Sequence, residues 1–115
     1  MRNDKENIIV NLTFQFALEI IDFTEEIKLK GKYSLADQLF RSGTSIGANV
    51  REAQNAESKA DFIHKLKIAA KEADETEYWL CLCKDSGHYP TNEKLLMDIQ
   101  SIIKVLSKII STSKK

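Results

Sequence analysis

The residues best placed to do chemistry are polar side chains at helical spacing in the middle of the chain. Arg41, Ser45, Asn49 and Glu52 follow one another at intervals of four, four and three residues, so a helix would align them along one strip. A second strip of similar spacing, which includes Glu75, follows further along the chain. We predict that these residues form a structural polar layer that fixes the register of two packed helices. A solvated face and a ligand-binding site are the alternatives.

The acidic residues and the two histidines raise the question of a di-iron carboxylate site. Such a site needs a Glu-x-x-His motif on each of two helices and two further inward-facing glutamates. No Glu-x-x-His occurs, His64 follows two apolar residues, and His88 falls in a predicted turn. No Ser or Cys is paired with a recognisable base either. The sequence therefore predicts a protein that is not an enzyme and that has no metal or other cofactor.

The two cysteines, Cys81 and Cys83, stand two residues apart. In a helix this spacing sends the side chains to different sides, which is poor geometry for a disulfide. The pattern indicates two small apolar residues in a chain made for a reducing cytoplasm. No uninterrupted apolar run reaches the length of a signal peptide or a membrane-spanning helix. We therefore expect a cytoplasmic protein without a membrane partner.

The charge balance bears on nucleic acid as a partner. Lys and Arg total 17, and so do Asp and Glu, which argues against a protein whose main task is to grip a phosphate backbone. A local patch repeated by an oligomer would be needed instead. The candidates for such contacts are Arg41, Arg51, Lys65, Lys67 and Lys71. Binding through them should be weak, sensitive to salt and indifferent to base sequence.

Four segments carry apolar residues at helical spacing, at about residues 7–29, 35–56, 59–85 and 91–110. We predict that Gly31 and Gly87 end the first and third helices. Ser34, Ser58 and Thr91 are the predicted N-caps of the second, third and fourth. Because the connections are short, sequential helices should be antiparallel neighbours. Residues 1–115 are therefore predicted to form one all-α domain, an antiparallel up-down-up-down four-helix bundle.

Two further features concern how the helices pack. Gly43 and Gly47 stand four residues apart among alanines, and such a pair of small residues lets two helix backbones approach closely. The first helix also carries apolar residues, among them Phe14, Leu18 and Ile21, beyond its core stripe. This exceeds the roughly three positions in seven that a core-facing helix needs. The excess predicts a homo-oligomer.

A resemblance rests on the run RSGTSIGANVREAQNAESKADFIHKLKIAAKEADETEYWL at residues 41–80. It closely resembles the bacterial four-helix bundle family, also called the 23S ribosomal RNA intervening-sequence protein family. The family pattern is an Arg, then S-I-x-x-N-[IV]-x-E, then F-x-x-x-L-x-I-A and a Glu-rich stretch. The matching residues are Arg41, Ser45, Ile46, Asn49, Val50, Glu52, Phe62, Leu66, Ile68, Ala69, Glu75 and Leu80. The resemblance covers about residues 8–111, and the chain departs from many members by having Arg51-Glu52-Ala53 in place of Ala-Glu-Gly.

The resemblance implies a left-handed antiparallel bundle that assembles into a homopentameric ring. Some family members are encoded within intervening sequences of 23S ribosomal RNA genes. A related accessory protein of diversity-generating retroelements forms a basic pentameric barrel that binds nucleic acid and a reverse transcriptase. We therefore expect a non-enzymatic oligomeric scaffold that binds another macromolecule, nucleic acid or protein. The alternative is an RNA- or DNA-binding ring that acts on ribosomal RNA or in a mobile-element nucleoprotein.

Overall fold

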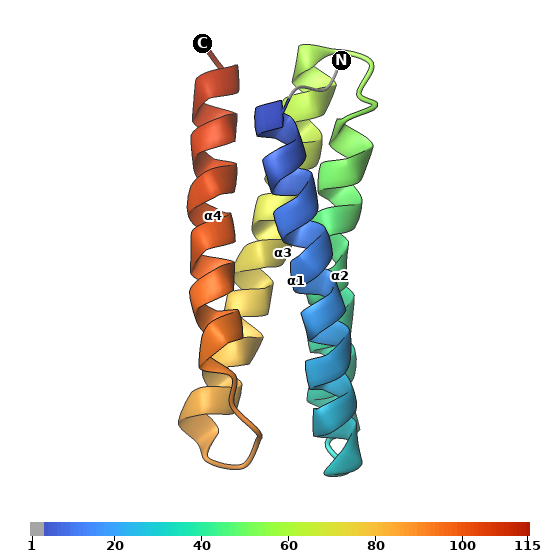
Figure 1. Ribbon diagram of the computed structural model, residues 1–115, viewed down its shortest axis with the longest axis vertical. Coiled ribbons are helices and arrows are strands. Elements are labelled where there is room, and N and C mark those ends of the chain that lie inside the picture. The colour runs from blue at the N-terminus through green and yellow to red at the C-terminus, as the bar shows by residue number, and fades with distance from the viewer. Residues whose placement is uncertain (1–3) are drawn as a thin grey trace.

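A computed structural model describes residues 4–115, with side chains from Ile8 onward. These residues form four helices and no strand: α1 (Asp4–Leu29), α2 (Tyr33–Ala53), α3 (Lys59–Ser86) and α4 (Glu93–Ser113). They pack side by side in a rod that measures 45 × 21 × 20 Å (Figure 1). Each connection reverses the chain, and α1 and α4 lie side by side although they are far apart in sequence. The predicted all-α class is confirmed.

The helix ends follow local backbone chemistry. Gly31 and Gly87 adopt φ angles of 76° and 75° and end α1 and α3, as predicted, because a left-handed backbone is strained for residues with a Cβ. The hydroxyl of Ser58 accepts a hydrogen bond from the Asp61 N–H at 3.0 Å, which confirms this N-cap. α2 ends at Ala53, three residues earlier than predicted, in a run of turn hydrogen bonds.

The two other predicted N-caps are wrong. α2 begins at Tyr33, so Ser34 lies inside its first turn, and Lys32 occupies the N-cap position without a side-chain hydrogen bond. α4 is capped by Asn92, whose Oδ1 accepts from the Leu95 N–H at 2.9 Å, and not by Thr91. Thr and Asn are both good N-cap residues. When two adjacent residues suit an N-cap equally well, the backbone path through the loop decides which of them caps the helix.

The core contains the inward stripes of all four helices, and the α1–α2 contact is its tightest part. A Cβ added to Gly43 would lie 2.9 Å from two side-chain carbons of Ile20. A Cβ added to Gly47 would lie 3.2 Å from the backbone oxygen of Thr13. Both glycines therefore let α2 approach α1 more closely than any other residue would, which confirms the close approach predicted from their spacing.

Candidate functional site: a polar seam and an apolar groove on either side of α2

The α2–α3 seam, defined by the polar residues between these helices, centres on Arg41. Its Nη1 donates to Glu72 Oε1 at 3.1 Å, and its Nη2 donates to Glu75 Oε2. The same Glu75 oxygen accepts from Trp79 Nε1 at 3.1 Å. One carboxylate thus holds a guanidinium from α2 and an indole from its own helix. The Arg41 hydrogen bond lowers the pKa of Glu75, while partial burial opposes this effect and Trp79 reinforces it.

The other members of the predicted layer bond differently. The Ser45 hydroxyl donates to the backbone oxygen of Arg41, and Asn49 Nδ2 donates to the Ser45 oxygen at 2.9 Å, so both bond within α2. Glu52 forms a separate ion pair with Lys65 Nζ at 3.0 Å. The side chains of Arg41 and Glu52 are 48% and 58% exposed. The structure therefore places these residues in a partly exposed row, and their role in fixing the register stays a prediction.

A buried hydroxyl pair lies behind this row and was missed by the sequence reasoning. Ser42 and Thr76 are fully buried, and their hydroxyls are hydrogen-bonded to each other at 2.9 Å. Thr76 also donates to the backbone oxygen of Glu72 at 2.8 Å. Among the described residues, no buried side-chain nitrogen or oxygen lacks a partner. The available signal was a threonine within the apolar stripe of α3, at a position where a core residue would be expected.

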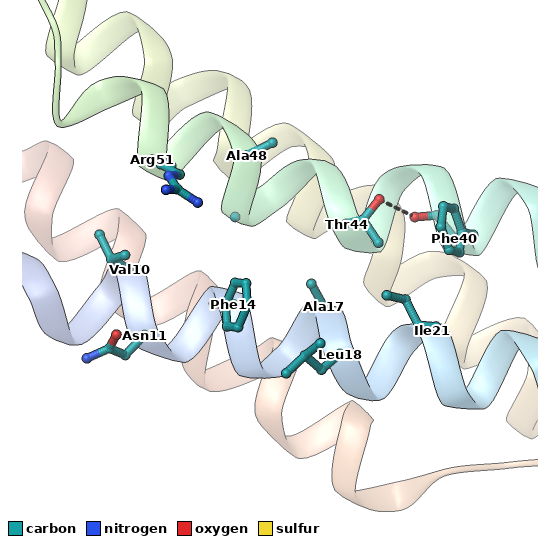
Figure 2. A pocket seen from close by; sticks show the side chains of 11 residues that line it. Val10, Asn11, Phe14, Ala17, Leu18, Ile21, Phe40, Thr44, Ala48 and Arg51 are labelled. Carbon is teal, nitrogen blue, oxygen red and sulfur yellow. Dashed lines mark hydrogen bonds between the residues drawn. The ribbon is translucent and has the colours of Figure 1, made fainter.

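The α1–α2 groove lies on the opposite side of α2 and has a volume of about 640 Å³. Its walls come from α1 and α2 alone, and Figure 2 shows their side chains. The lining residues are Val10, Asn11, Phe14, Ala17, Leu18, Ile21, Phe40, Thr44, Gly47, Ala48 and Arg51. The Thr44 hydroxyl is already bonded to the Phe40 backbone oxygen at 2.7 Å. The groove therefore offers an occupant mainly apolar contact, with Arg51 as its cation.

The groove is lined by large apolar side chains that the isolated chain leaves in solvent. Phe14 is 54% exposed, Leu18 43%, Phe40 42% and Ile21 37%. On α1, Ile8 and Leu12 extend the exposed apolar surface beyond the groove. The predicted excess of apolar residues on the first helix is therefore present at its surface.

The family model described as 23S rRNA-intervening sequence protein matches residues 5–111. This chain belongs to that family. A crystal structure of a protein of unknown function from the S23 ribosomal protein family of Bacteroides thetaiotaomicron VPI-5482 is similar over 93% of this chain and 98% of that chain, with 41% identity and a TM-score of 0.87. No curated protein matches. The resemblance inferred from residues 41–80 is confirmed.

In this family member, the five basic residues predicted to contact nucleic acid are placed in different surroundings. Arg41 and Lys65 are engaged with carboxylates, and the ion pair with Glu52 raises the pKa of Lys65. Arg51 lines the groove. Lys67 and Lys71 are exposed, and no carboxylate within residues 8–115 lies within 4.0 Å of either. The structure thus separates the set and does not form one patch from it.

Groups that could support covalent or metal chemistry are sparse in the described part of the chain. Cys83 is buried, and desolvation raises its pKa to about 11, so its thiol stays protonated and unreactive near neutral pH. Within the described residues, no three His, Cys, Asp or Glu side chains come together as a metal site. Over the same residues, none of the helices has the length and apolar character needed to cross a bilayer.

Proposed function

We propose that this protein is a non-enzymatic scaffold that assembles with copies of itself through the α1–α2 groove and binds another macromolecule in the assembled form. The assembly proposed is a ring of left-handed, up-down-up-down bundles. The pentameric number follows from the family resemblance alone. The description of the family, 23S rRNA-intervening sequence protein, motivates the choice of a partner from the translation or nucleic-acid machinery.

The observation that carries this proposal is the exposed apolar surface around the groove. Phe14, Leu18 and Phe40 are each more than two-fifths exposed and line one continuous cavity. An exposed patch of this kind on a monomer favours aggregation unless a partner covers it. Because every copy carries the same groove, a closed ring would cover each one with a different surface of the next copy. The neutral net charge removes long-range repulsion between copies.

Static light scattering on a charged groove variant tests the proposal. The double variant Phe14→Glu, Leu18→Glu places two carboxylates in the groove without touching the buried stripe of α1. We expect the wild type to be oligomeric at micromolar concentration and the variant to have the mass of a monomer. Met97→Glu is the matched control, because Met97 is 67% exposed but lies on α4, away from the groove. A monomeric wild type, or a double variant that stays oligomeric, would contradict the proposal.

The second candidate function is an RNA- or DNA-binding ring. Lys67 and Lys71 support it, because both are exposed and neither is paired with a described carboxylate. A ring would repeat these lysines on every subunit, and avidity would raise the affinity of weak single contacts. This candidate predicts binding that weakens steeply as salt increases. The scaffold without nucleic acid predicts no such binding at any salt concentration.

A further inference from the structure

The neutral chain is polarised along the long axis of the bundle. Cutting each helix near its midpoint divides the described side chains into residues 8–16, 43–72 and 103–115 on one side and residues 17–42 and 73–102 on the other. The first group, termed the basic half, contains nine Lys and Arg against four Asp and Glu. The second group, termed the acidic half, contains six against eleven. Figure 1 shows the α2–α3 connection and the C-terminus at the same end of the rod.

Ion pairing reinforces this difference. In the acidic half, Lys28, Arg41, Lys84 and Lys94 each contact a carboxylate, at distances of 3.4, 3.1, 3.2 and 2.8 Å. Among the described cations of the basic half, Lys65 forms an ion pair, and its partner is Glu52. The cations of the acidic half are therefore largely neutralised locally, whereas those of the basic half are not.

The uncompensated lysines come from two helices that meet at this end. Lys59, Lys67 and Lys71 lie on the first half of α3, and Lys104 and Lys108 on the second half of α4. All five are exposed, and none has an Asp or Glu carboxylate within 4.0 Å among residues 8–115. Lys59 Nζ donates to the Lys115 backbone oxygen at 3.4 Å, which joins the start of α3 to the end of the chain.

We propose that the basic half binds the phosphate backbone of a nucleic acid through these lysines of α3 and α4. Lys59 and Lys71 are about 18 Å apart along α3, at about 1.5 Å per residue, so the surface suits an extended polyanion better than a small anion. Each lysine that replaces condensed counterions adds favourable, salt-dependent free energy. The aromatic pair Tyr78 and Trp79 lies in the acidic half, so this pair does not accompany the lysines as a stacking platform. Binding is therefore indifferent to base sequence.

One observation favours nucleic acid over a membrane as the ligand of this surface. A second observation changes the set of contact residues predicted from the sequence. The exposed large apolar side chains of the basic half, Ile8, Leu12 and Phe14, all lie on α1, and none falls within residues 43–72 or 103–115, which carry the basic residues. Binding at a bilayer interface needs apolar side chains that insert beside the cations. Arg41 lies in the acidic half and is held by Glu72 and Glu75, which removes it from the site. Lys104 and Lys108 enter the site instead. The proposal rests on the second candidate function and deepens it, because it assigns the phosphate contacts to one half of the bundle and adds Lys104 and Lys108 of α4 to them.

The test is fluorescence anisotropy with a labelled single-stranded RNA of mixed sequence, titrated between about 50 and 200 mM salt. The basic-half variant carries Lys67→Glu, Lys104→Glu and Lys108→Glu. The matched control carries Lys28→Glu, Lys30→Glu and Lys84→Glu, which gives the same net charge but places the changes in the acidic half. We expect at least about tenfold weaker binding for the first variant and a much smaller loss for the control. Losing three phosphate contacts should also reduce the slope of log K against log salt by about 2.

Several outcomes would overturn the proposal. They are no binding by the wild type at the lowest salt, equal losses in the two triple variants, or tighter binding to anionic lipid vesicles than to the RNA. If the Glu variant has an altered circular dichroism spectrum, the variant with Gln at the same three positions replaces it and must show the same loss. Light scattering on both variants keeps this test separate from the scaffold. Unchanged assembly with lost RNA binding supports the proposal, and assembly lost together with binding overturns the assignment of these lysines to the ligand.

Discussion

α2 packs against α3 on one side and against α1 on the other, and the two contacts use different chemistry. Toward α3, a buried Ser42–Thr76 hydroxyl pair and exposed ion pairs join the helices. Toward α1, Gly43 and Gly47 let the backbones approach, and the apolar surplus remains outside as the groove. Directional bonds specify register, whereas close apolar packing specifies distance. We therefore expect the α2–α3 seam to govern the alignment of the helices, while assembly through the α1–α2 side stays a proposal.

The largest expected effect comes from filling the α1–α2 contact. Gly43→Val adds a Cβ that would lie 2.9 Å from two Ile20 side-chain carbons, and Ile20 is fully buried and branched at Cβ, so it cannot move aside easily. We expect the free energy of unfolding to fall by about 3 kcal/mol, at the upper end of typical overpacking costs. Urea denaturation followed by circular dichroism measures this change.

Gln38→Val on the exposed face of α2 is the matched control for that experiment. It introduces the same β-branched side chain into the same helix without a close neighbour. Its cost should stay below about 0.5 kcal/mol, the difference in helix propensity. If Gly43→Val is as stable as Gln38→Val, the α1–α2 contact does not depend on the close approach of the two helix backbones at Gly43. The contrast drawn between the α1–α2 and α2–α3 contacts would then be wrong for α1–α2.

The second prediction concerns the buried hydroxyl pair of the seam. Thr76→Val keeps the shape of the side chain but leaves the Ser42 hydroxyl without its partner across the interface. We expect a loss of about 1–3 kcal/mol for this single variant. The double variant Ser42→Ala, Thr76→Val should lose less than the sum of the two single variants, because each single variant already breaks the one hydrogen bond that the two hydroxyls share. Additive losses in denaturant melts would mean that the pair does not bridge α2 and α3 energetically.

The fold could be predicted from the sequence further than the site could, and particular residues give the reason. Helical spacing and Gly31 and Gly87 determine where α1 and α3 end, because these signals act within one or two turns of chain. Ser58 was identified for the same reason. Thr91 and Asn92 both suit an N-cap, so residue type alone does not distinguish them, and the path of the loop places Asn92 at the cap.

The surface features depend on contacts between helices that sequence spacing alone does not define. The partner of Thr76 is Ser42, 34 residues earlier, and no local pattern connects the two. Net charge likewise conceals the polarity of the bundle, since Lys104 and Lys108 compensate acidic residues of other segments in the sum but not in space. Both features become visible only when the helices are aligned side by side.

The smallest expected effect belongs to the exposed part of the seam. Arg41 lowers the pKa of Glu75 from its ordinary value of 4.5. A carboxyl group whose pKa is lower in the folded state stabilises that state fully above its ordinary pKa. This stabilisation is lost as the pH falls through the lower, folded-state value. Because the Arg41 side chain is 48% exposed, the contribution at neutral pH should be less than about 1 kcal/mol.

Arg41→Met tests this contribution by its pH dependence. We expect the variant to be slightly less stable than the wild type at pH 7, and the difference to shrink as the pH falls below about 4.5, the ordinary pKa of Glu75. Thermal melts at several pH values measure it. The same substitution is also made in a Glu75→Gln background, where residue 75 no longer titrates. There the loss of stability caused by Arg41→Met should vary less with pH than it does in the wild-type background. A difference that keeps its full size from pH 7 to pH 3 in the wild-type background would mean that Arg41 acts through the packing of its aliphatic stem. The α2–α3 contact would then resemble the α1–α2 contact more than its bonding pattern suggests.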